Sequence, residues 1–162
     1  MNELETLYRR HASAVFRFAW GLGGDRAAAE DIVSETFVRL LTRAPRIETT
    51  TALAYLLAIA RNVFLTGYRR RRREVELPAD LAVPDADPAG RLDDQASLES
   101  VLRALDTLSE GERAALLLRV DHELSYEEIA AVLGTSLVAA RVRVHRARVR
   151  LASAREPQGR QA

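Results

Sequence analysis

Apolar residues recur at spacings of three and four along most of this chain, which is the pattern of amphipathic helices. The pattern predicts helices over residues 2–22, 25–43 and 52–68. After a proline-containing interval it resumes near Ala96 and continues, with breaks, to about residue 154. Because every predicted element is helical, we expect an all-α protein.

The most informative stretch runs from Leu124 to Leu151 and predicts two helices separated by a tight turn. Ser125 and Glu128 have the spacing of a capping box, in which the hydroxyl and the carboxylate each satisfy an amide at the helix start. Gly134 supplies the permissive backbone of a turn, and Ser136 can cap the following helix. The stretch therefore predicts a helix-turn-helix.

The second helix of this motif places apolar residues on one face and arginines on both flanks of that face. The expected buried face consists of Leu137, Ala140, Val144, Ala147 and Leu151. Arg141 and Arg148 lie on one flank, and Arg143, Arg146 and Arg150 lie on the other. Arginine can make paired hydrogen bonds to guanine or bind phosphates, so this helix is typical of reading the major groove.

Three valines, Val138, Val142 and Val149, form the outermost line of the same helix. We expect Val142 to contact a thymine methyl group and Val149 to contact a protein partner. The alternative is a solvated, arginine-rich surface helix. The cap, the turn and the preceding helix favour the DNA-binding interpretation.

Composition limits the possible classes of protein. The chain has 162 residues, a net charge of +1 and 24 basic residues, all of them arginine. The absence of cysteine excludes disulfides and thiolate zinc sites, and the three histidines are far apart, so we expect no metal and no cofactor. The most apolar window, residues 52–60, is about half of a membrane span, and no signal peptide is apparent, so we expect a cytoplasmic protein without membrane insertion.

Proline and acidic residues divide the chain into two predicted helical domains. We expect a first domain over 1–73, an acidic linker over 74–95, a second domain over 96–154 and a disordered tail over 155–162. The second domain should be a four-helix unit that ends in the helix-turn-helix. The residues expected on the buried side of its first helix are Leu98, Val101, Leu102 and Leu105. Ser109 and Glu112 form another capping box.

Two clusters in the first domain are candidates for binding. Glu30, Asp31 and Glu35 form an acidic helix face, which is either solvated or a docking surface for a basic partner. Periodicity alone does not choose between these alternatives. The arginine run over 69–73 follows three aromatic residues, a mixture that can hold phosphates and stack unpaired bases.

Four segments in order resemble the extracytoplasmic-function (ECF) sigma factors, the small promoter-specificity subunits of bacterial RNA polymerase. They are AEDIVSETFVRL from residue 29, YLLAIARN from residue 55, LSEGERAALLLR from residue 108, and SYEEIAAVLG followed by RVHRAR. The resemblance covers almost the whole chain. It implies a protein that is not an enzyme and has no small-molecule substrate, and that directs core polymerase to a small set of promoters.

The resemblance also implies partners and site residues. The partners are the clamp coiled coil and flap of core RNA polymerase, promoter DNA and an anti-sigma factor. The residues implied in polymerase docking are Asp31, Glu35, Thr36 and Arg39. Those implied in recognising the minus-ten element are Tyr55, Arg61, Asn62, Arg69 and Arg70. Those implied in reading the minus-thirty-five element are Ser136, Arg141, Val142, Arg143, His145, Arg146 and Arg148.

The sequence departs from the family pattern at several of these positions. Family members usually have tryptophan at Tyr55, and often aspartate or asparagine at Thr66. At the start of the recognition helix, Ser136 and residues 138–140 replace a common proline and glycine-threonine-valine pattern, which removes a plausible phosphate contact. Base stacking by an aromatic residue survives the first change, but promoter preference need not follow better-known relatives.

Two other functions compete with this interpretation. One is a helix-turn-helix regulator that acts without polymerase, but it leaves the segments at 29–40 and 55–62 unexplained. The other is a sigma-like adaptor that sequesters an anti-sigma protein and never reads DNA. The altered start of the recognition helix favours the adaptor, and the retained arginines oppose it.

Overall fold

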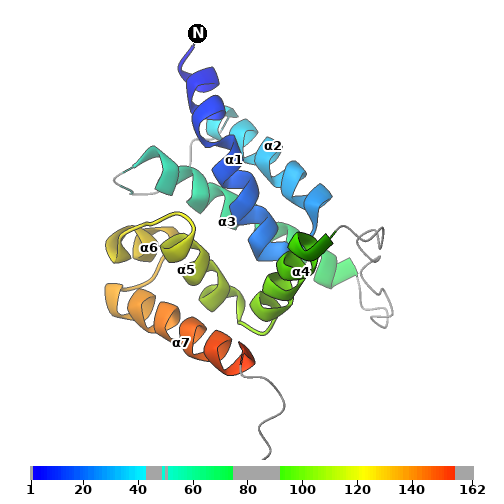
Figure 1. Ribbon diagram of the computed structural model, residues 1–162. Coiled ribbons are helices and arrows are strands. Elements are labelled where there is room, and N and C mark those ends of the chain that lie inside the picture. The colour runs from blue at the N-terminus through cyan, green and yellow to red at the C-terminus, as the bar shows by residue number, and fades with distance from the viewer. Residues whose placement is uncertain (1, 43–48, 50, 75–91, 156–162) are drawn as a thin grey trace, which may run out of the picture.

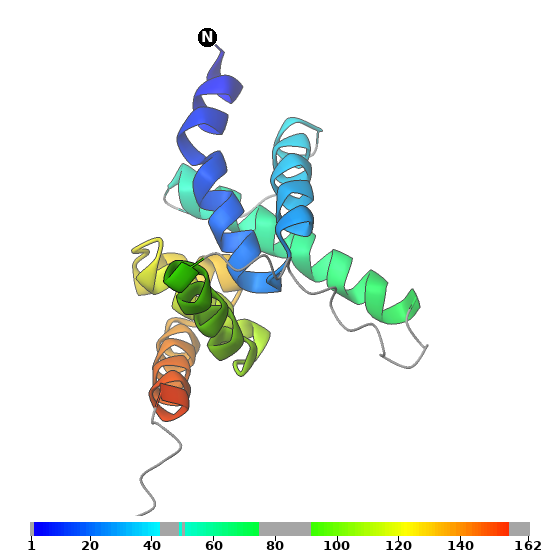
Figure 2. The ribbon, with the colours of Figure 1, turned by 45° about the vertical axis from the view of Figure 1, so that its right-hand side comes forward.

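The computed structural model describes residues 2–42, 49, 51–74 and 92–155, and these form seven helices and no strand. The expectation of an all-α fold is confirmed. The first three helices are α1 (Glu3–Gly23), α2 (Arg26–Thr42) and α3 (Ala52–Glu74). The other four are α4 (Leu92–Asp106), α5 (Glu110–Val120), α6 (Tyr126–Leu133) and α7 (Leu137–Arg155). We refer to α1–α3 as the N-terminal unit and to α4–α7 as the C-terminal unit (Figures 1 and 2).

Local capping explains where most of these helices begin. The Asn2 side chain accepts a hydrogen bond from the Glu5 amide at 2.8 Å, and Asp25 Oδ1 accepts from the Ala27 amide at 3.0 Å. Ser109 and Glu112 form the predicted capping box at the start of α5. Each of these contacts satisfies an amide that the first helical turn leaves without a partner.

Two helix ends differ from the predictions. We placed the end of the third helix at Tyr68, but α3 continues through the arginines to Glu74, since arginine is a good helix former. The expected linker over 74–95 is too long at both ends, because Glu74 is helical and α4 begins at Leu92. The remainder of that linker, residues 75–91, and nearly all of the expected tail lie outside the described residues.

The N-terminal unit is a hairpin of α1 and α2 with α3 packed across it. Gly24 ends α1 with a positive φ of 71°, a conformation that L side chains rarely adopt. Its core includes the buried side chains of Val15, Phe18, Ile32 and Phe37.

In the C-terminal unit, α5 and α6 pack against the predicted apolar face of α7. Ala140, Val144 and Ala147 are at most 1% exposed, which confirms the centre of that face. The helix α4 packs against α5 and α7 through Leu105, which is buried. Val101, predicted to be buried, is 55% exposed, so that prediction is wrong. The side chain of Leu98 lies outside the described ones.

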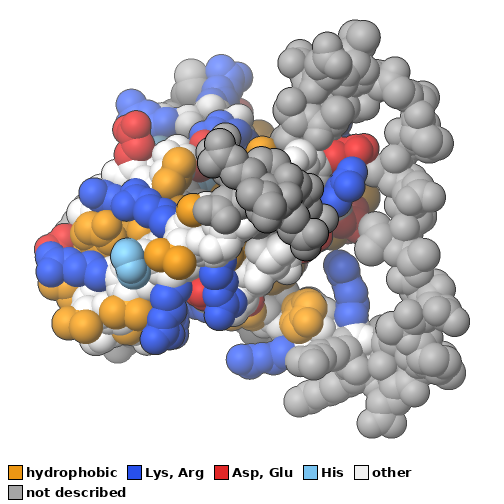
Figure 3. Space-filling model, turned by 60° about the horizontal axis from the view of Figure 1, so that its bottom comes forward, with side chains coloured by type: hydrophobic (Ala, Val, Ile, Leu, Met, Phe, Trp, Pro, Cys, Tyr) orange, Lys and Arg blue, Asp and Glu red, His pale blue; other side chains and the backbone are white. Residues whose placement is uncertain are grey.

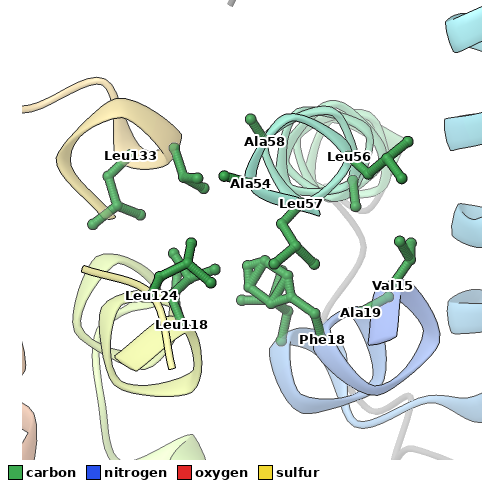
Figure 4. Close-up of a cluster of buried hydrophobic side chains, with 14 of the residues drawn as sticks. Val15, Phe18, Ala19, Ala54, Leu56, Leu57, Ala58, Leu118, Leu124 and Leu133 are labelled. Carbon is green, nitrogen blue, oxygen red and sulfur yellow. The ribbon is translucent and has the colours of Figure 1, made fainter. Parts of the chain in front are cut away.

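The two units share one continuous apolar core (Figure 4). Leu57 of α3 extends toward Phe18 of α1, and Ala54 and Ala58 of α3 face α6, which carries Leu133. All of these side chains are buried. The helix α3 is therefore enclosed on two sides, against its own hairpin and against the C-terminal unit.

Candidate DNA-binding and protein-binding surfaces

The helix-turn-helix forms as the local sequence predicts. Ser125 Oγ accepts from the Glu128 amide at 3.1 Å, Gly134 turns the chain at φ 65°, and Ser136 Oγ accepts from the Ala139 amide at 3.1 Å. This geometry fixes the direction of α7 relative to α6. It leaves the side of α7 opposite Val144 open to solvent.

The exposed side of α7 carries most of the residues expected to read DNA. On the face of the molecule that includes α7, arginine side chains surround apolar side chains (Figure 3). The expected contacts that are exposed there are Arg141, Val142, His145, Arg146 and Arg148. The neighbouring valines Val138 and Val149 are 69% and 50% exposed. The arrangement is a positively charged helix with apolar points of contact, which suits the major groove.

Two arginines of α7 turn toward α5 instead. The guanidinium of Arg143 lies over Gly111, where an added Cβ would be 3.5 Å from Cζ. Arg150 Nη1 lies 3.0 Å from Glu112 Oε1, and the Glu112 side chain is only 7% exposed. Arg143, an expected DNA contact, therefore points toward α5 and does not share the exposed face of Arg141 and Arg146.

Tyr126 is a functional candidate that sequence analysis missed. The Cζ atoms of Arg119 and Arg141 lie 4.4 Å and 5.5 Å from the centroid of its ring. Arg119 also donates from Nη1 to the Leu124 carbonyl at 2.9 Å. The ring attracts both cations and so restrains Arg141 near the start of α6. The sequence contains an aromatic residue directly after a cap, but only the fold brings the two arginines to it.

The expected minus-ten contacts on α3 divide into two groups. Asn62, Arg69 and Arg70 are exposed. Tyr55 is half-buried, and the Arg61 side chain is only 12% exposed because it pairs with Glu110 of α5. The structure therefore does not present all five expected contacts on one free surface.

The acidic face of α2 borders a groove of about 610 Å³ that is lined by residues of α1, α2 and α3 and by Arg113 of α5. Its lining includes the acids Asp31 and Glu35, the apolar residues Ile32 and Phe64, and Arg71 of α3. Glu30, the third acid of the cluster, does not line this groove. Carboxylates beside apolar side chains in one groove fit a basic, amphipathic helix.

The other two expected docking residues lie differently. Arg39 Nε is 3.1 Å from Glu35 Oε1, so these side chains form a pair one helical turn apart. Thr36 is 0% exposed, and its hydroxyl donates to the Ile32 carbonyl at 2.6 Å. A side chain without exposed surface cannot contact a partner in this conformation, so Thr36 is removed from the docking set as a correction.

His122 lies between the units and is unsuited to carrying charge. Its side chain is 1% exposed, and its ring meets that of Phe18 edge to face at 5.7 Å. Nε2 makes no hydrogen bond and lies 3.4 Å from Asp121 Oδ2, which also faces Arg17 Nε at 3.3 Å. Burial lowers the pKa of His122 below 6.5; Asp121 opposes this shift and Arg17 adds to it.

This lowered pKa predicts a pH dependence of stability. Below pH 6.5 the unfolded chain binds a proton at His122 that the folded chain resists, so the free energy of unfolding should fall as pH drops from 7.5 to 5.5. Urea unfolding at both pH values measures the loss. In His122→Phe the loss in free energy of unfolding should be smaller, because only the other titrating groups still contribute to it. One of these groups is His11, whose pKa is also lowered by burial and by Arg10. An equal loss in both proteins would contradict the assignment.

Among the residues that the structure describes, no group of three or more His, Asp or Glu side chains is placed to hold a metal ion. No helix in the described ranges is long and apolar enough to span a membrane.

Comparison with family models gives two matches in chain order. The model described as Sigma-70 region 2 matches residues 7–74, which make up most of the N-terminal unit. The model described as Sigma-70, region 4 matches residues 98–151, which contain the helix-turn-helix.

Curated relatives match across both units. The chain is 37% identical over 145 residues to ECF RNA polymerase sigma factor EcfG of Rhodopseudomonas palustris, covering 84% of this chain and 76% of EcfG. It is also 37% identical over 156 residues to ECF RNA polymerase sigma factor SigE of Mycolicibacterium smegmatis, covering 93% of this chain. The chain spans only 61% of the length of SigE.

Two solved structures are similar in overall fold. The sigma factor RpoE of Bartonella quintana, in complex with the anti-sigma factor NepR, has a TM-score of 0.77 and 28% identity, covering 94% of this chain and 96% of RpoE. CnrH, in complex with the cytosolic domain of CnrY, has a TM-score of 0.70 and 26% identity, covering 93% and 86% of the two chains. Because both matches span nearly the whole chain, they include α1–α3 and α4–α7 together.

Proposed function

Because the chain belongs to the ECF sigma factors of bacterial RNA polymerase, we propose that it binds core polymerase and directs it to a specific set of promoters. The observation that carries this proposal is the exposed arginine face of α7 in a complete helix-turn-helix. The C-terminal unit reads the upstream element as duplex DNA, and the N-terminal unit recognises the minus-ten element. The protein acts as a transcription factor rather than an enzyme, in the cytoplasm.

The assignment of duplex reading to α7 follows from its side chains. Arginine matches the acceptor pair of guanine, and Val142 can contact a thymine methyl group. The ring of Tyr126 restrains Arg141, so less conformational entropy is lost when that arginine binds DNA.

The N-terminal unit supplies the complementary step. Tyr55 provides an aromatic surface for an unpaired base, and Arg69 and Arg70 provide charge for the backbone. Opening a duplex costs a few kcal/mol for each disrupted stacking step, and captured bases offset part of that cost.

Core polymerase is the proposed occupant of the groove beside α2. Its clamp coiled coil would place basic side chains against Asp31 and Glu35, while apolar side chains cover Ile32 and Phe64. We also propose an anti-sigma partner, since RpoE, which resembles this chain over both units, was solved in complex with the anti-sigma factor NepR.

Run-off transcription tests the proposed function. Sigma-free bacterial core polymerase is incubated with a pool of GC-rich genomic fragments, with and without this protein. Discrete new start sites are the expected result, and alignment of the fragments yields the promoter motif. Absence of transcripts and of co-elution with core polymerase would instead favour a free-standing regulator or an anti-sigma-binding adaptor.

Replacing Arg146 with alanine should weaken binding to the upstream element by about 1–3 kcal/mol, the range for a bidentate base contact. Fluorescence anisotropy on the recovered duplex and on a scrambled duplex measures the change. Arg103→Ala is the matched control, because it removes an equally charged, 79% exposed side chain of the same unit outside α7. Equal losses on the two duplexes would reassign Arg146 to a phosphate contact.

A further inference from the structure

Arg61 is an expected minus-ten contact whose side chain binds the C-terminal unit directly. Its Nε and Nη2 atoms donate to the two carboxylate oxygens of Glu110, each at 2.8 Å. Its Nη1 atom donates to the carbonyl of Leu133 at 3.4 Å. The two acceptor residues belong to α5 and α6, so a single side chain joins three helices.

This pairing occupies the donors that a nucleic acid would need. A carboxylate that accepts two parallel hydrogen bonds from a guanidinium has the same pattern that a phosphate offers. The Arg61 side chain is 12% exposed and that of Glu110 is 31% exposed, so water competes only weakly for the pair. Arg61 cannot contact DNA while Glu110 holds it.

The apolar core keeps this pair in place. Leu57 on α3 lies against Phe18, close to Leu118 of α5 and Leu124, which precedes α6 (Figure 4). Gly21 of α1 approaches α5 so closely that an added Cβ would stand 2.7 Å from Leu117 Cδ1. A lasting loss of the Arg61–Glu110 ion pair therefore requires the two units to separate. This separation exposes the apolar side chains between them to water.

Further polar contacts connect the units at other points. Arg113 Nη1 donates to the Leu22 carbonyl at the end of α1. Arg17 pairs with Asp121 at 3.3 Å, although both side chains are at least 40% exposed, so this surface pair contributes little. The Arg61–Glu110 pair is the better candidate for control, because it is largely buried and includes a residue expected to read DNA.

We propose that Glu110 is an intramolecular competitor of promoter DNA: it holds Arg61 in a closed state, and capture of the minus-ten strand requires the two units to separate. This inference rests on the proposed function. Asn62, Arg69 and Arg70 stay exposed in the closed state, so loose contact with a polyanion precedes opening. Polymerase and single-stranded DNA then shift the population toward the open state by binding it preferentially.

The closed state is measured directly in the full-length free chain. The chain has no cysteine, so Ser34→Cys on α2 and Ser153→Cys on α7, both exposed, accept a dye pair for single-molecule energy transfer. In Glu110→Gln the ratio of closed to open molecules should fall about tenfold, as expected when a charged hydrogen-bonded partner is lost. The matched control is Glu99→Gln, which removes an exposed carboxylate that pairs with Arg103 on α4.

A charge exchange separates this contact from general destabilisation. Arg61→Glu alone should open the chain, and adding Glu110→Arg should restore closed molecules without restoring DNA capture. An unchanged distribution in Glu110→Gln, or no recovery in the double variant, would overturn the closed-state contact.

Binding of single-stranded DNA supplies the second measurement. The probe is the nontemplate strand around the start sites that run-off transcription recovers. Glu110→Gln should bind it about tenfold more tightly than the unsubstituted chain, because more molecules are competent to bind. Opening without tighter binding would overturn the competition. If run-off transcription recovers no promoter and the protein does not co-elute with core polymerase, the proposed function fails, whereas energy transfer still decides whether Glu110 closes the chain.

Discussion

Replacing Phe18 with alanine should lower the free energy of unfolding by about 3–5 kcal/mol. Its side chain is 0% exposed and lies where Leu57 of α3 and His122 of the C-terminal unit meet α1. Truncation removes apolar burial and leaves a cavity that three rigid helices cannot fill. Urea unfolding followed by circular dichroism measures the loss.

The same experiment examines whether the core is shared. Because Phe18 belongs to one cluster that spans both units, α4–α7 should lose stability together with α1–α3. Val101→Ala is the control, since Val101 is 55% exposed and its truncation should cost well under 1 kcal/mol. A loss confined to the N-terminal unit, seen as a second transition at unchanged urea concentration, would contradict a shared core.

Reversing the charge of Asp31 should weaken binding to core polymerase at least tenfold, which corresponds to about 1.4 kcal/mol or more. In Asp31→Arg, a cation replaces an exposed carboxylate that lines the groove, and an approaching basic helix would meet a like charge. Binding is measured by titrating labelled protein with sigma-free core polymerase.

Glu30→Arg is the matched control for this substitution. Glu30 is an exposed acid on the same helix, and its reversal changes the net charge equally, but its side chain does not line the groove. The control should bind core polymerase nearly as well as the unsubstituted protein. Equal weakening by both substitutions would assign the effect to overall charge and remove Asp31 from a specific docking site.

Features that depend on a few neighbouring residues were predictable. Ser125, Gly134 and Ser136 define the helix-turn-helix because capping and left-handed turns are decided by the side chains at those positions. The centre of the buried face of α7 follows from residue spacing, whereas Leu137 and Leu151 at its ends are half-buried. The helix ends at Glu74 and Leu92 were missed, since charged and polar residues can continue a helix or end it.

Features that depend on a second surface were not predictable. Val101 is exposed because only a small part of α4 packs against α7. Thr36 is buried because other helices pack around α2. Neither Tyr126 nor His122 was recognised, because the groups that surround each of them come from other helices. Periodicity describes one helix and contains no information about its neighbours.

The sequence by itself determined the helices, the turn of the DNA-reading motif and, by resemblance, the family. Only the tertiary structure decided that α3 is enclosed on two sides and that Glu110 occupies Arg61. The physical reason is the range of the interactions. Caps and helical faces are set by residues within about one turn, whereas Arg61 and Glu110 are 49 positions apart and meet only because two apolar surfaces pack together.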